Sequence, residues 1–359
     1  MTKRIIAQDE TVVIGADVHM NKHVVTAKVG KERKGAVHLS PNPEAWRTFI
    51  NRFPGCRIHV IYESGPQGYN LYDWLTQMNP DNGATISVCI APPALVPKAP
   101  GIHVKTDKRD SMALILAIET NSFRPVVVPD KAAREERELT RTRAQIKDIQ
   151  KKLKNQIHGL VKFHGVAYPQ GCGPWSSAWM KQLEANVKAT DTTGYLYQAF
   201  TLKRGLYETT TQTLSDIDKK IRQLTKTGLC ACAAQKLQQL CGIGPLSAAI
   251  IATEVADFSA FDNSAAFASY IGVVPRESSS GETVKRGRIT KAGNRRIRRI
   301  LTECAWAWVR RDEDALRQFR KLCMGKPERA RIAIVAMSRK LAVKAYHAVV
   351  NGPPVEKAA

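Results

Sequence analysis

The sequence contains no apolar run of the length that spans a membrane. A bilayer-crossing helix needs about 20 consecutive, mostly apolar residues, and no stretch of this chain approaches that length. The first residues, Met1-Thr2-Lys3-Arg4, also lack the apolar run and cleavage site of a secretory signal. We therefore expect a cytoplasmic protein with no membrane partner.

Cys-x-x-Cys motifs are absent, the one Cys-x-Cys (Cys230-Ala231-Cys232) has no neighbouring His, and acidic residues are scarce relative to basic ones. The eight cysteines form no Cys-x-x-Cys pair, which argues against a zinc site. Asp and Glu number 32 against 55 Lys and Arg, giving a formal net charge of +23. This excess predicts a polyanionic partner, most simply DNA or RNA, and a basic protein that binds membrane surfaces is the competing interpretation.

The 359-residue chain is long enough for two or three domains, and residues 1–129 alternate strand and helix patterns. Apolar runs predict strands at 11–18, 23–29, 36–39, 57–62 and 85–90, and helical spacing predicts helices at 43–53 and 69–78. This order of elements indicates an α/β domain with a mixed sheet covered by helices.

Four carboxylates fall where such a sheet places functional side chains. Asp17 ends the first strand, Glu63 follows the fourth, and Asp107 and Asp110 open the helix after the fifth. The last two alone would be explained by the favourable interaction of acids with the positive end of a helix dipole. Together, the four acids predict a Mg²⁺ site, because Mg²⁺ binds hard oxygen ligands.

From residue 130 the pattern becomes helical. Residues 132–161 carry an apolar stripe, and a loop, a short helix at 175–183 and a second long helix at 194–226 follow. We expect an antiparallel coiled-coil arm over residues 130–228 that either dimerises or lies along nucleic acid. Its basic face is either solvated or in contact with phosphate, and consists of Arg141, Arg143, Lys147, Lys151, Lys152 and Lys154.

A helical domain is predicted over residues 229–352, followed by a tail at 353–359. Two helices joined by Gly242-Ile243-Gly244 match the helix-hairpin-helix pattern, in which the N–H groups that open the second helix can hold a phosphate. A plain helical corner is the alternative. Residues 258–270 are expected to continue this helical domain, and further helices are expected from 295, at 305–309 and at 332–350.

A serine-rich stretch lies inside this helical domain. Ser278, Ser279 and Ser280 precede Gly281, and such a loop is usually a flexible connection. A hydroxyl among cations also suits attack on a phosphodiester, because arginines hold the phosphate while the hydroxyl becomes a covalent nucleophile. With Gly242 and Gly244, the residues assigned to nucleic-acid binding are Lys285, Arg286, Arg288, Lys291, Arg295 and Arg296.

These motifs, in this order, resemble the DEDD transposases of the IS one-ten family, the bridge-RNA-guided serine recombinases of insertion sequences. The resemblance runs from about residue 11 to about residue 350. The residues that carry it are Gly15-Ala16-Asp17, Tyr62-Glu63-Ser64-Gly65, Lys105-Thr106-Asp107 with Asp110, Gly242-Ile243-Gly244, Gly272-Val273-Val274-Pro275, Ser280-Gly281 and the stretch from Lys291 to Arg296.

The resemblance implies an N-terminal RuvC-like domain (RNase H fold), a coiled-coil arm and a C-terminal helical transposase domain. It implies that Asp17, Glu63, Asp107 and Asp110 bind Mg²⁺. Ser280, directly before the glycine, would form a phosphoserine link to DNA, although the adjacent Ser278 and Ser279 leave the choice open.

The implied partners are double-stranded donor and target DNA, a structured non-coding guide (bridge) RNA whose base pairing reads sequence, and further copies of the chain. The carboxylates of one subunit and the serine of another would form each site within a dimer of dimers. The implied location is the bacterial cytoplasm, at the nucleoid during activity.

Two other functions fit part of the pattern. A hydrolytic RuvC-like Holliday-junction nuclease would use the four carboxylates and metal-bound water, without a serine. A nucleic-acid-binding protein without chemistry would explain the charge but not the acids at strand ends. A DEDD exonuclease is disfavoured, because its first motif carries an acid two residues after the first Asp, where this chain has His19.

Overall fold

The computed structural model describes residues 10–93, 107–120, 125–277 and 286–353. Contacts within the chain divide it into two units, Met1–Val128 and Pro129–Ala359. The first unit is a mixed α/β structure, and the second consists of helices with one two-stranded sheet. The predicted α/β and all-α parts are therefore both present.

A mixed sheet forms the centre of the first unit. Its strands lie in the order β3-β2-β1-β5-β6, and β4 pairs with β2. β1, β5 and β6 are parallel to one another, whereas β2 is antiparallel to β1. The strands are β1 (Thr11–Val18), β2 (His23–Val29), β3 (Glu32–Arg33), β4 (Val37–Leu39), β5 (Arg57–Glu63) and β6 (Thr85–Ala91). All five predicted strands are confirmed. The two-residue β3 was not predicted, because both of its residues are charged and exposed.

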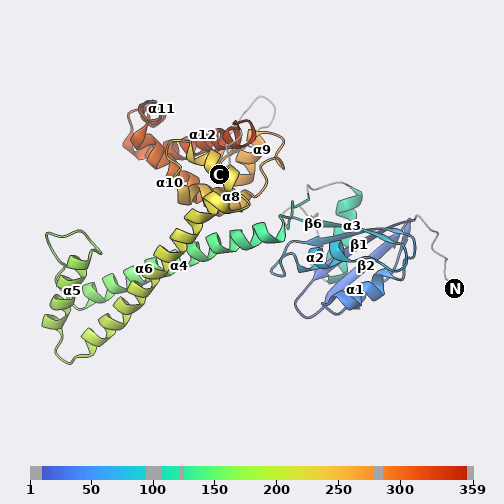
Figure 1. Ribbon diagram of the computed structural model, residues 1–359, viewed down its shortest axis with the longest axis horizontal. Coiled ribbons are helices and arrows are strands. Elements are labelled where there is room, and N and C mark those ends of the chain that lie inside the picture. Colours follow the sequence, from blue (N-terminus) through green and yellow to red (C-terminus); the bar gives the residue numbers. More distant parts are fainter. Residues whose placement is uncertain (1–9, 94–106, 121–124, 278–285, 354–359) are drawn as a thin grey trace. The chain divides into compact units, whose positions relative to one another are not determined.

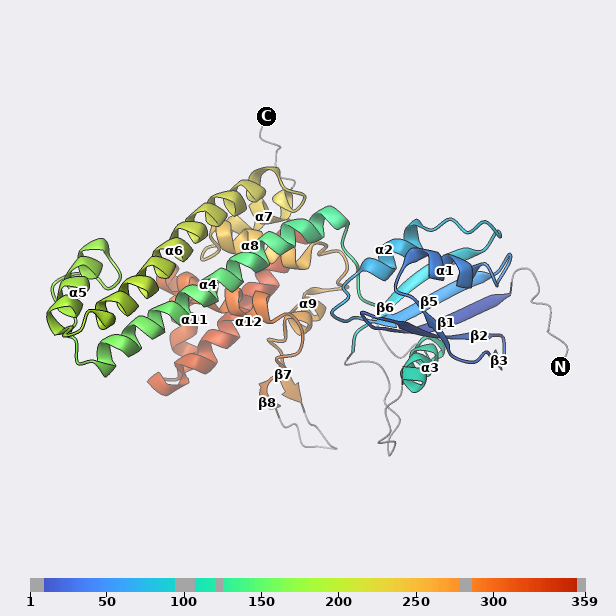
Figure 2. The same cartoon turned by 90° about the horizontal axis from the view of Figure 1, so that it is seen from below.

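Helices cover both faces of this sheet, as Figure 2 shows. On one face lie α1 (Pro43–Ile50) and α2 (Asn70–Gln77), whose apolar residues share one buried core with Val12, Ile14 and Ala16 of β1. Because successive side chains of a strand point to opposite faces, the odd-numbered residues of β1 face the other way.

The opposite face is covered by α3 (Asp107–Glu119). There, Leu114 and Ala117 of this helix pack against Ile61 of β5 and Ala91 of β6. Ile61 and Glu63 are two residues apart on one strand, so Glu63 lies on this same face of the sheet.

α3 packs directly onto β1 at Gly15. A Cβ atom at this position would lie 2.0 Å from the carbonyl oxygen of Ser111. The Ser111 hydroxyl is buried and lies 2.8 Å from the Thr26 hydroxyl of β2, as partners in one hydrogen bond. At the other end of α3, Lys28 donates a hydrogen bond to Glu119. α3 therefore runs antiparallel to β1, and its first turn lies toward the carboxyl end of that strand.

This packing predicts a large cost for Gly15→Ala. The added methyl group would collide with helix backbone, and overpacking of this kind typically costs about 1–3 kcal/mol or more. We expect faster hydrogen exchange of the β1 and α3 amides in this variant. Gly35→Ala is the matched control in the same unit, since a Cβ there meets nothing within 4 Å. Unchanged exchange in Gly15→Ala would contradict the described seating of α3.

Two long antiparallel helices, α4 (Lys131–Phe163) and α6 (Tyr195–Thr227), form an arm in the second unit, with α5 (Ser177–Thr190) at its far end (Figure 1). Polar contacts recur at seven-residue intervals along α4. Glu136 accepts from the Leu229 amide, Arg143 pairs with Asp218, and Gln150 donates to Thr211. A separate apolar core, including Trp179, Leu183 and Phe200, closes the tip.

The remaining helices of this unit surround a second apolar core that includes Phe267, Leu301 and Met337. They are α7 (Ala231–Gln238), α8 (Pro245–Val255), α9 (Ser264–Ile271), α10 (Arg295–Arg311), α11 (Glu313–Cys323) and α12 (Ala330–Val350), with a 3₁₀ turn at Pro327–Arg329. Within the described ranges, no helix combines the length and apolar character needed to span a bilayer.

Several boundaries here differ from the predictions. Within the stretch 258–270, which was expected to continue the helical domain, the helix begins only at Ser264, because the Asn263 side chain caps it by accepting from the Ala266 amide. α10 is one helix from Arg295 to Arg311 rather than two separate pieces. α11 and the antiparallel strands β7 (Pro275–Glu277) and β8 (Arg286–Ile289) were not predicted.

Candidate functional site

Two of the predicted acids lie side by side at the carboxyl edge of the first unit's sheet. Ala16 pairs with Tyr62 in the parallel register of β1 and β5, so the next residues are Asp17 and Glu63. Both face α3, and side chains at the carboxyl ends of parallel strands are where open α/β sheets form sites. The Asp17 side chain is 20% exposed, and Glu63 is exposed.

The first turn of α3 lies at this same edge. Ser111 is level with Gly15, and position 107 lies one helical turn earlier, about 6 Å along the axis. Asp17 lies two strand residues, about 7 Å, beyond Gly15 in the same direction. The backbone therefore brings Asp17, Glu63 and position 107 together. The side chain of Asp107 lies outside the described residues, and Asp110 is half-buried in the same turn. We call these four acids the acidic edge.

His19 adds a group that the sequence analysis left out of this site. Its Nε2 atom lies 3.1 Å from Oδ2 of Asp17. Its position two residues after Asp17, beyond a strand end, was the available signal. Among the described side chains, a set that omits Asp107, no three His, Cys, Asp or Glu residues form a possible metal site. The donors of the acidic edge are carboxylate oxygens, which suit Mg²⁺.

The serine stretch lies between β7 and β8 in the sequence. Ser278, Ser279, Ser280 and Lys285 themselves lie outside the described residues. The base of this hairpin is held by backbone hydrogen bonds. The amides of Thr290, Lys291 and Asn294 donate to the carbonyls of Val274, Gly272 and Tyr270, at 2.8, 3.1 and 3.1 Å respectively. We call these six residues the hairpin base.

The hairpin base joins two motifs that are about twenty residues apart in the sequence. A Cβ atom at Gly293 would lie 1.8 Å from the Tyr270 carbonyl oxygen, and one at Gly272 would lie 2.0 Å from the Ala292 carbonyl oxygen. Glycine is therefore required at both positions by close backbone approach. The Gly272–Pro275 and Lys291–Arg296 motifs thus form one structural feature, although the sequence presents them as two.

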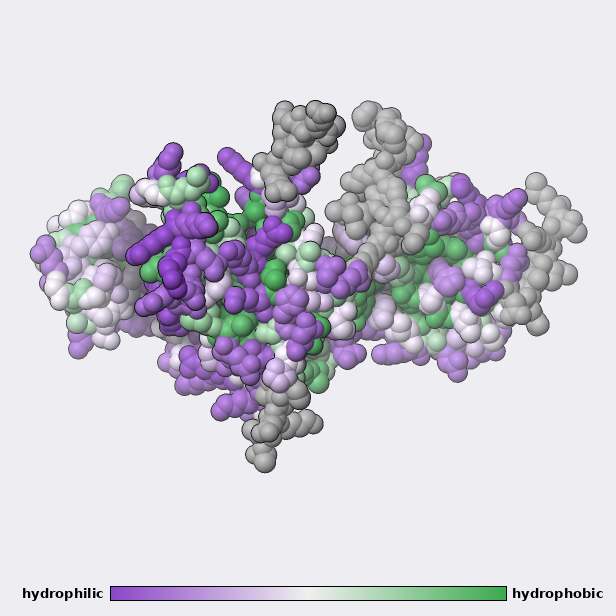
Figure 3. Space-filling model, turned by 90° about the horizontal axis from the view of Figure 1, so that it is seen from above, coloured by the Kyte–Doolittle hydropathy of each residue, from purple (hydrophilic) through white to green (hydrophobic). Residues whose placement is uncertain are grey.

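Exposed cations follow the hairpin into α10. Arg288, Lys291, Arg295 and Arg296 are all exposed, whereas Lys285 and the Arg286 side chain lie outside the description. Figure 3 shows further hydrophilic side chains gathered over α10–α12, left of centre. The exposed cations of these helices and the following turn, which the sequence analysis missed, include Arg310, Arg311, Arg317, Arg320, Lys321, Lys326, Arg331, Arg339 and Lys340.

The two helices predicted to flank Gly242-Ile243-Gly244 in the helix-hairpin-helix pattern are present as α7 and α8. Gly242 has φ +92°, and a Cβ there would lie 2.6 Å from the Cys304 carbonyl oxygen. This glycine is therefore needed for close packing onto α10. Gly244 precedes α8 and is exposed, with open space around its Cβ position.

Much of the arm's basic face is engaged within the protein. Arg141 pairs with Glu254 and Arg143 with Asp218. Lys147 donates to Gln150, and Lys154 lies 4.7 Å from the centre of the Trp175 ring. Of the six predicted cations, Lys151 and Lys152 are the exposed ones that remain available for a partner.

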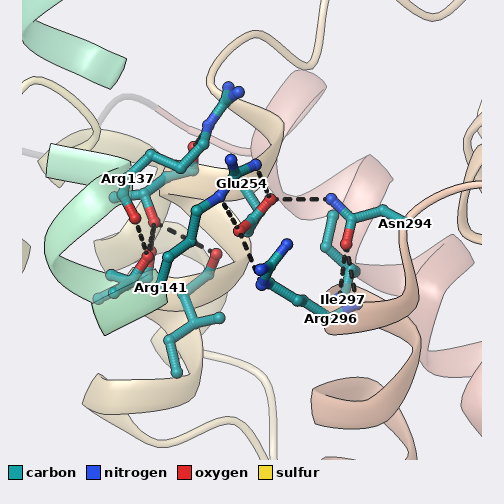
Figure 4. A network of polar contacts seen from close by, with 10 residues as sticks. Arg137, Arg141, Glu254, Asn294, Arg296 and Ile297 are labelled. Carbon is teal, nitrogen blue, oxygen red and sulfur yellow. Dashed lines mark hydrogen bonds and ion pairs between the residues drawn. The ribbon is translucent and has the colours of Figure 1, made fainter. Parts of the chain in front are cut away.

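A buried carboxylate connects the arm to the hairpin base, as Figure 4 shows. Glu254 of α8 is 2% exposed. Arg141 of α4 donates to both of its oxygens, at 2.9 and 3.1 Å. The Asn294 side-chain amide donates to Oε2 at 2.9 Å. Burial raises the pKa of Glu254, but hydrogen bonds from Arg141 and Asn294 outweigh this effect, so its pKa lies below the usual value.

Comparison with known proteins adds to these observations. A family model described as "Transposase IS116/IS110/IS902 family" matches residues 234–321, which include α8, the hairpin base and α10. A Sinorhizobium fredii protein named "Putative transposase y4qE" is 29% identical over 311 residues, covering 85% of this chain and 74% of the relative.

Two further relatives are transposases by name. The "Transposase for insertion sequence element IS1328" of Yersinia enterocolitica is 25% identical over 57% of this chain and 60% of its own. The "Transposase for insertion sequence element IS1111A" of Coxiella burnetii is 24% identical over 57% of this chain and 55% of its own.

Proposed function

The chain belongs to the IS116/IS110/IS902 family of transposases, and from this we propose that it is an RNA-guided DNA recombinase acting through a phosphoserine intermediate. The observation that carries the proposal is the acidic edge, where three separate segments bring their acids to one edge of the sheet. This chemistry also requires a nucleophile. The serine stretch can supply it, because it follows strand β7 of a hairpin whose base is held by backbone hydrogen bonds and it precedes exposed arginines in the sequence.

In this proposal, Asp17, Glu63, Asp107 and Asp110 would hold Mg²⁺ in a RuvC-like domain. A metal held there would supply positive charge against the negative charge that develops on the phosphodiester. The acids themselves contribute hard oxygen donors on a rigid sheet edge. His19 orients Asp17 through its hydrogen bond.

The serine supplies the covalent step. The Ser280 hydroxyl attacks a backbone phosphorus, a serine–phosphate bond forms, and the bond from phosphorus to the leaving sugar oxygen breaks. The serine hydroxyl gives up its proton and the leaving sugar oxygen gains one. Attack by a sugar hydroxyl of the new strand later breaks the serine–phosphate bond, and the proton lost by that hydroxyl is balanced by the one that the serine oxygen regains. Arg288, Lys291 and Arg295, which are exposed beside the hairpin, hold the phosphate during both steps.

The partners that we propose are donor and target double-stranded DNA and a structured guide RNA. The exposed cations of α10–α12 and the net charge of +23 support a large polyanionic partner. Base pairing by the RNA would read the DNA sequence. The carboxylates of one copy and the serine of another would act together within a dimer of dimers.

Covalent trapping tests this function. The protein is incubated with Mg²⁺, the element's RNA and end-labelled DNA, and is then denatured. We expect label on the protein only when the RNA is present. Label that forms without RNA would refute guidance, whereas cleaved DNA without a protein adduct would favour the hydrolytic nuclease.

DNA binding should weaken steeply with salt. Each phosphate neutralised by Lys or Arg releases counterions, so a footprint of six to ten phosphates loses roughly 10³–10⁵ in affinity between 50 and 200 mM salt. Fluorescence anisotropy across that range measures the slope. A flat profile would contradict a broad phosphate contact by the exposed cations.

A further inference from the structure

We infer that Glu254 is a positioning residue for the hairpin of β7 and β8, between which the serine stretch lies in the sequence. Its buried carboxylate fixes the hairpin base and the start of α10 to the arm helix α4. This inference rests on the proposed role of the serine stretch. Glu254 belongs neither to the acidic edge nor to the exposed cations of the hairpin and α10–α12.

Glu254 links three elements of the second unit. It lies on α8, Arg141 approaches from α4, and Asn294 approaches from the end of the hairpin base. Arg137, one turn before Arg141, donates to the carbonyl oxygen of Thr253, the residue before Glu254. The arm is therefore attached to α8 at two successive residues, and Glu254 extends this attachment to Asn294. A separate, exposed ion pair joins Arg299 of α10 to Asp148 of α4.

The two ends of the Asn294 side-chain amide have different partners, one as acceptor and the other as donor. Its side-chain oxygen caps α10 by accepting from the amides of Arg296 and Ile297, at 2.9 and 3.1 Å. Its side-chain nitrogen donates to Glu254. Aspartate caps a helix as well as asparagine does, so the cap alone does not require an amide. The amide is needed because an aspartate would place a second carboxylate against Glu254.

The position of Asn294 is transmitted to the strand that leads back to the serines. Its backbone amide donates to the Tyr270 carbonyl, and the neighbouring Lys291 and Thr290 amides complete the hairpin base. Arg296, one of the exposed cations, has its Nε atom 3.9 Å from Glu254 Oε1. A shift of Asn294 therefore moves the hairpin and the phosphate-holding cations together.

A buried ion pair is a poor choice if only packing is required. Apolar residues of similar volume often give equal or greater stability, whereas removal of one partner leaves a charge buried without compensation. The three hydrogen bonds that Glu254 accepts from Arg141 and Asn294 instead select one arrangement of α4, α8 and α10. This is the property that a nucleophile on an adjoining hairpin requires, because catalytic groups act only when held close to the productive geometry.

A reciprocal exchange of charge and amide tests the inference. Glu254→Gln and Asn294→Asp each disrupt the match. The double variant restores the contact between positions 254 and 294 with reversed polarity, while Arg141 keeps one of its two acceptors at position 254. We expect each single variant to form the covalent DNA adduct about tenfold more slowly, and the double variant to return to within about threefold of wild type. DNA affinity should stay within about twofold throughout, because neither substitution removes any of the exposed cations of α10–α12.

The matched control is Asp218→Asn. Asp218 accepts a similar two-point contact from Arg143 on the same arm helix, but its contact joins α4 to α6 and does not involve α10. We expect near wild-type adduct formation from this variant. A loss equal to that of Glu254→Gln would show that any arginine–carboxylate pair of the arm matters, and would overturn the inference.

Hydrogen exchange separates failure of this inference from failure of the proposed function. The amides of residues 290–297 should exchange faster in both single variants and recover in the double variant, whether or not a serine reacts. If the wild-type protein forms no adduct, the recombinase proposal fails. The exchange pattern then still shows whether Glu254 holds the hairpin base. Unchanged exchange in the single variants, or no recovery in the double variant, overturns it.

Discussion

Replacing Asp107 by Asn should abolish DNA strand transfer while leaving DNA binding intact or slightly stronger. The substitution removes one negative charge from the acidic edge, where position 107 lies one turn before Ser111 and level with Asp17. Metal-assisted charge stabilisation is worth several kcal/mol at a phosphodiester, which corresponds to a loss of about a thousandfold in rate. DNA affinity should not fall, because a repulsive charge has been removed.

Strand-transfer assays beside anisotropy measurements separate these two effects. Asp81→Asn is the matched control, since Asp81 is an exposed acid of the same unit that contacts Arg47 away from the acidic edge. Chelation of Mg²⁺ should reproduce the Asp107→Asn result in the wild-type protein. Full activity in a chelator would exclude a metal-dependent role for the four acids.

Replacing Ser280 by Ala should eliminate the covalent protein–DNA adduct completely. Alanine has no hydroxyl to form the bond to phosphorus, so no adduct should form unless another serine acts as the nucleophile. Binding of DNA should be unaffected, because the exposed arginines and lysines are retained. The measurement is the label that remains on denatured protein after incubation with Mg²⁺, RNA and end-labelled DNA.

The neighbouring serines give the experiment its controls. Ser278→Ala and Ser279→Ala should keep the adduct if Ser280 is the nucleophile. An adduct that survives in Ser280→Ala but disappears in one of these variants would move the role to that serine. Cleavage without an adduct in all variants would show that no serine of this stretch is the nucleophile.

Short-range patterns in the sequence were sufficient for the sheet and the long helices. β1 and β5 are rich in apolar residues and carry Asp17 and Glu63 at their carboxyl ends, so both the strands and the placement of these acids followed from local spacing. α4 and α6 have helical periodicity over 33 residues each. The roles assigned to the four acids and to Ser280 remain predictions.

Features that depend on distant partners could not be predicted in this way. Gly15 was noted as part of a motif, but the reason for a glycine is the carbonyl of Ser111, which approaches from α3. Arg141 was assigned to a basic face, whereas its partner Glu254 lies more than a hundred residues later. A helix pattern shows which residues are polar, but not which polar residues are buried against another element.

The arm has a mechanical consequence. From Arg141 to the end of α4 at Phe163 the helix continues for about 33 Å, so a rotation of about 5° at Arg141 displaces the tip by about 3 Å. Conversely, a load applied at the tip acts with this leverage on the Arg141–Glu254 contact. The arm can thus act as a lever, and the Arg141–Glu254 contact near its inner end also holds Asn294 of the hairpin base.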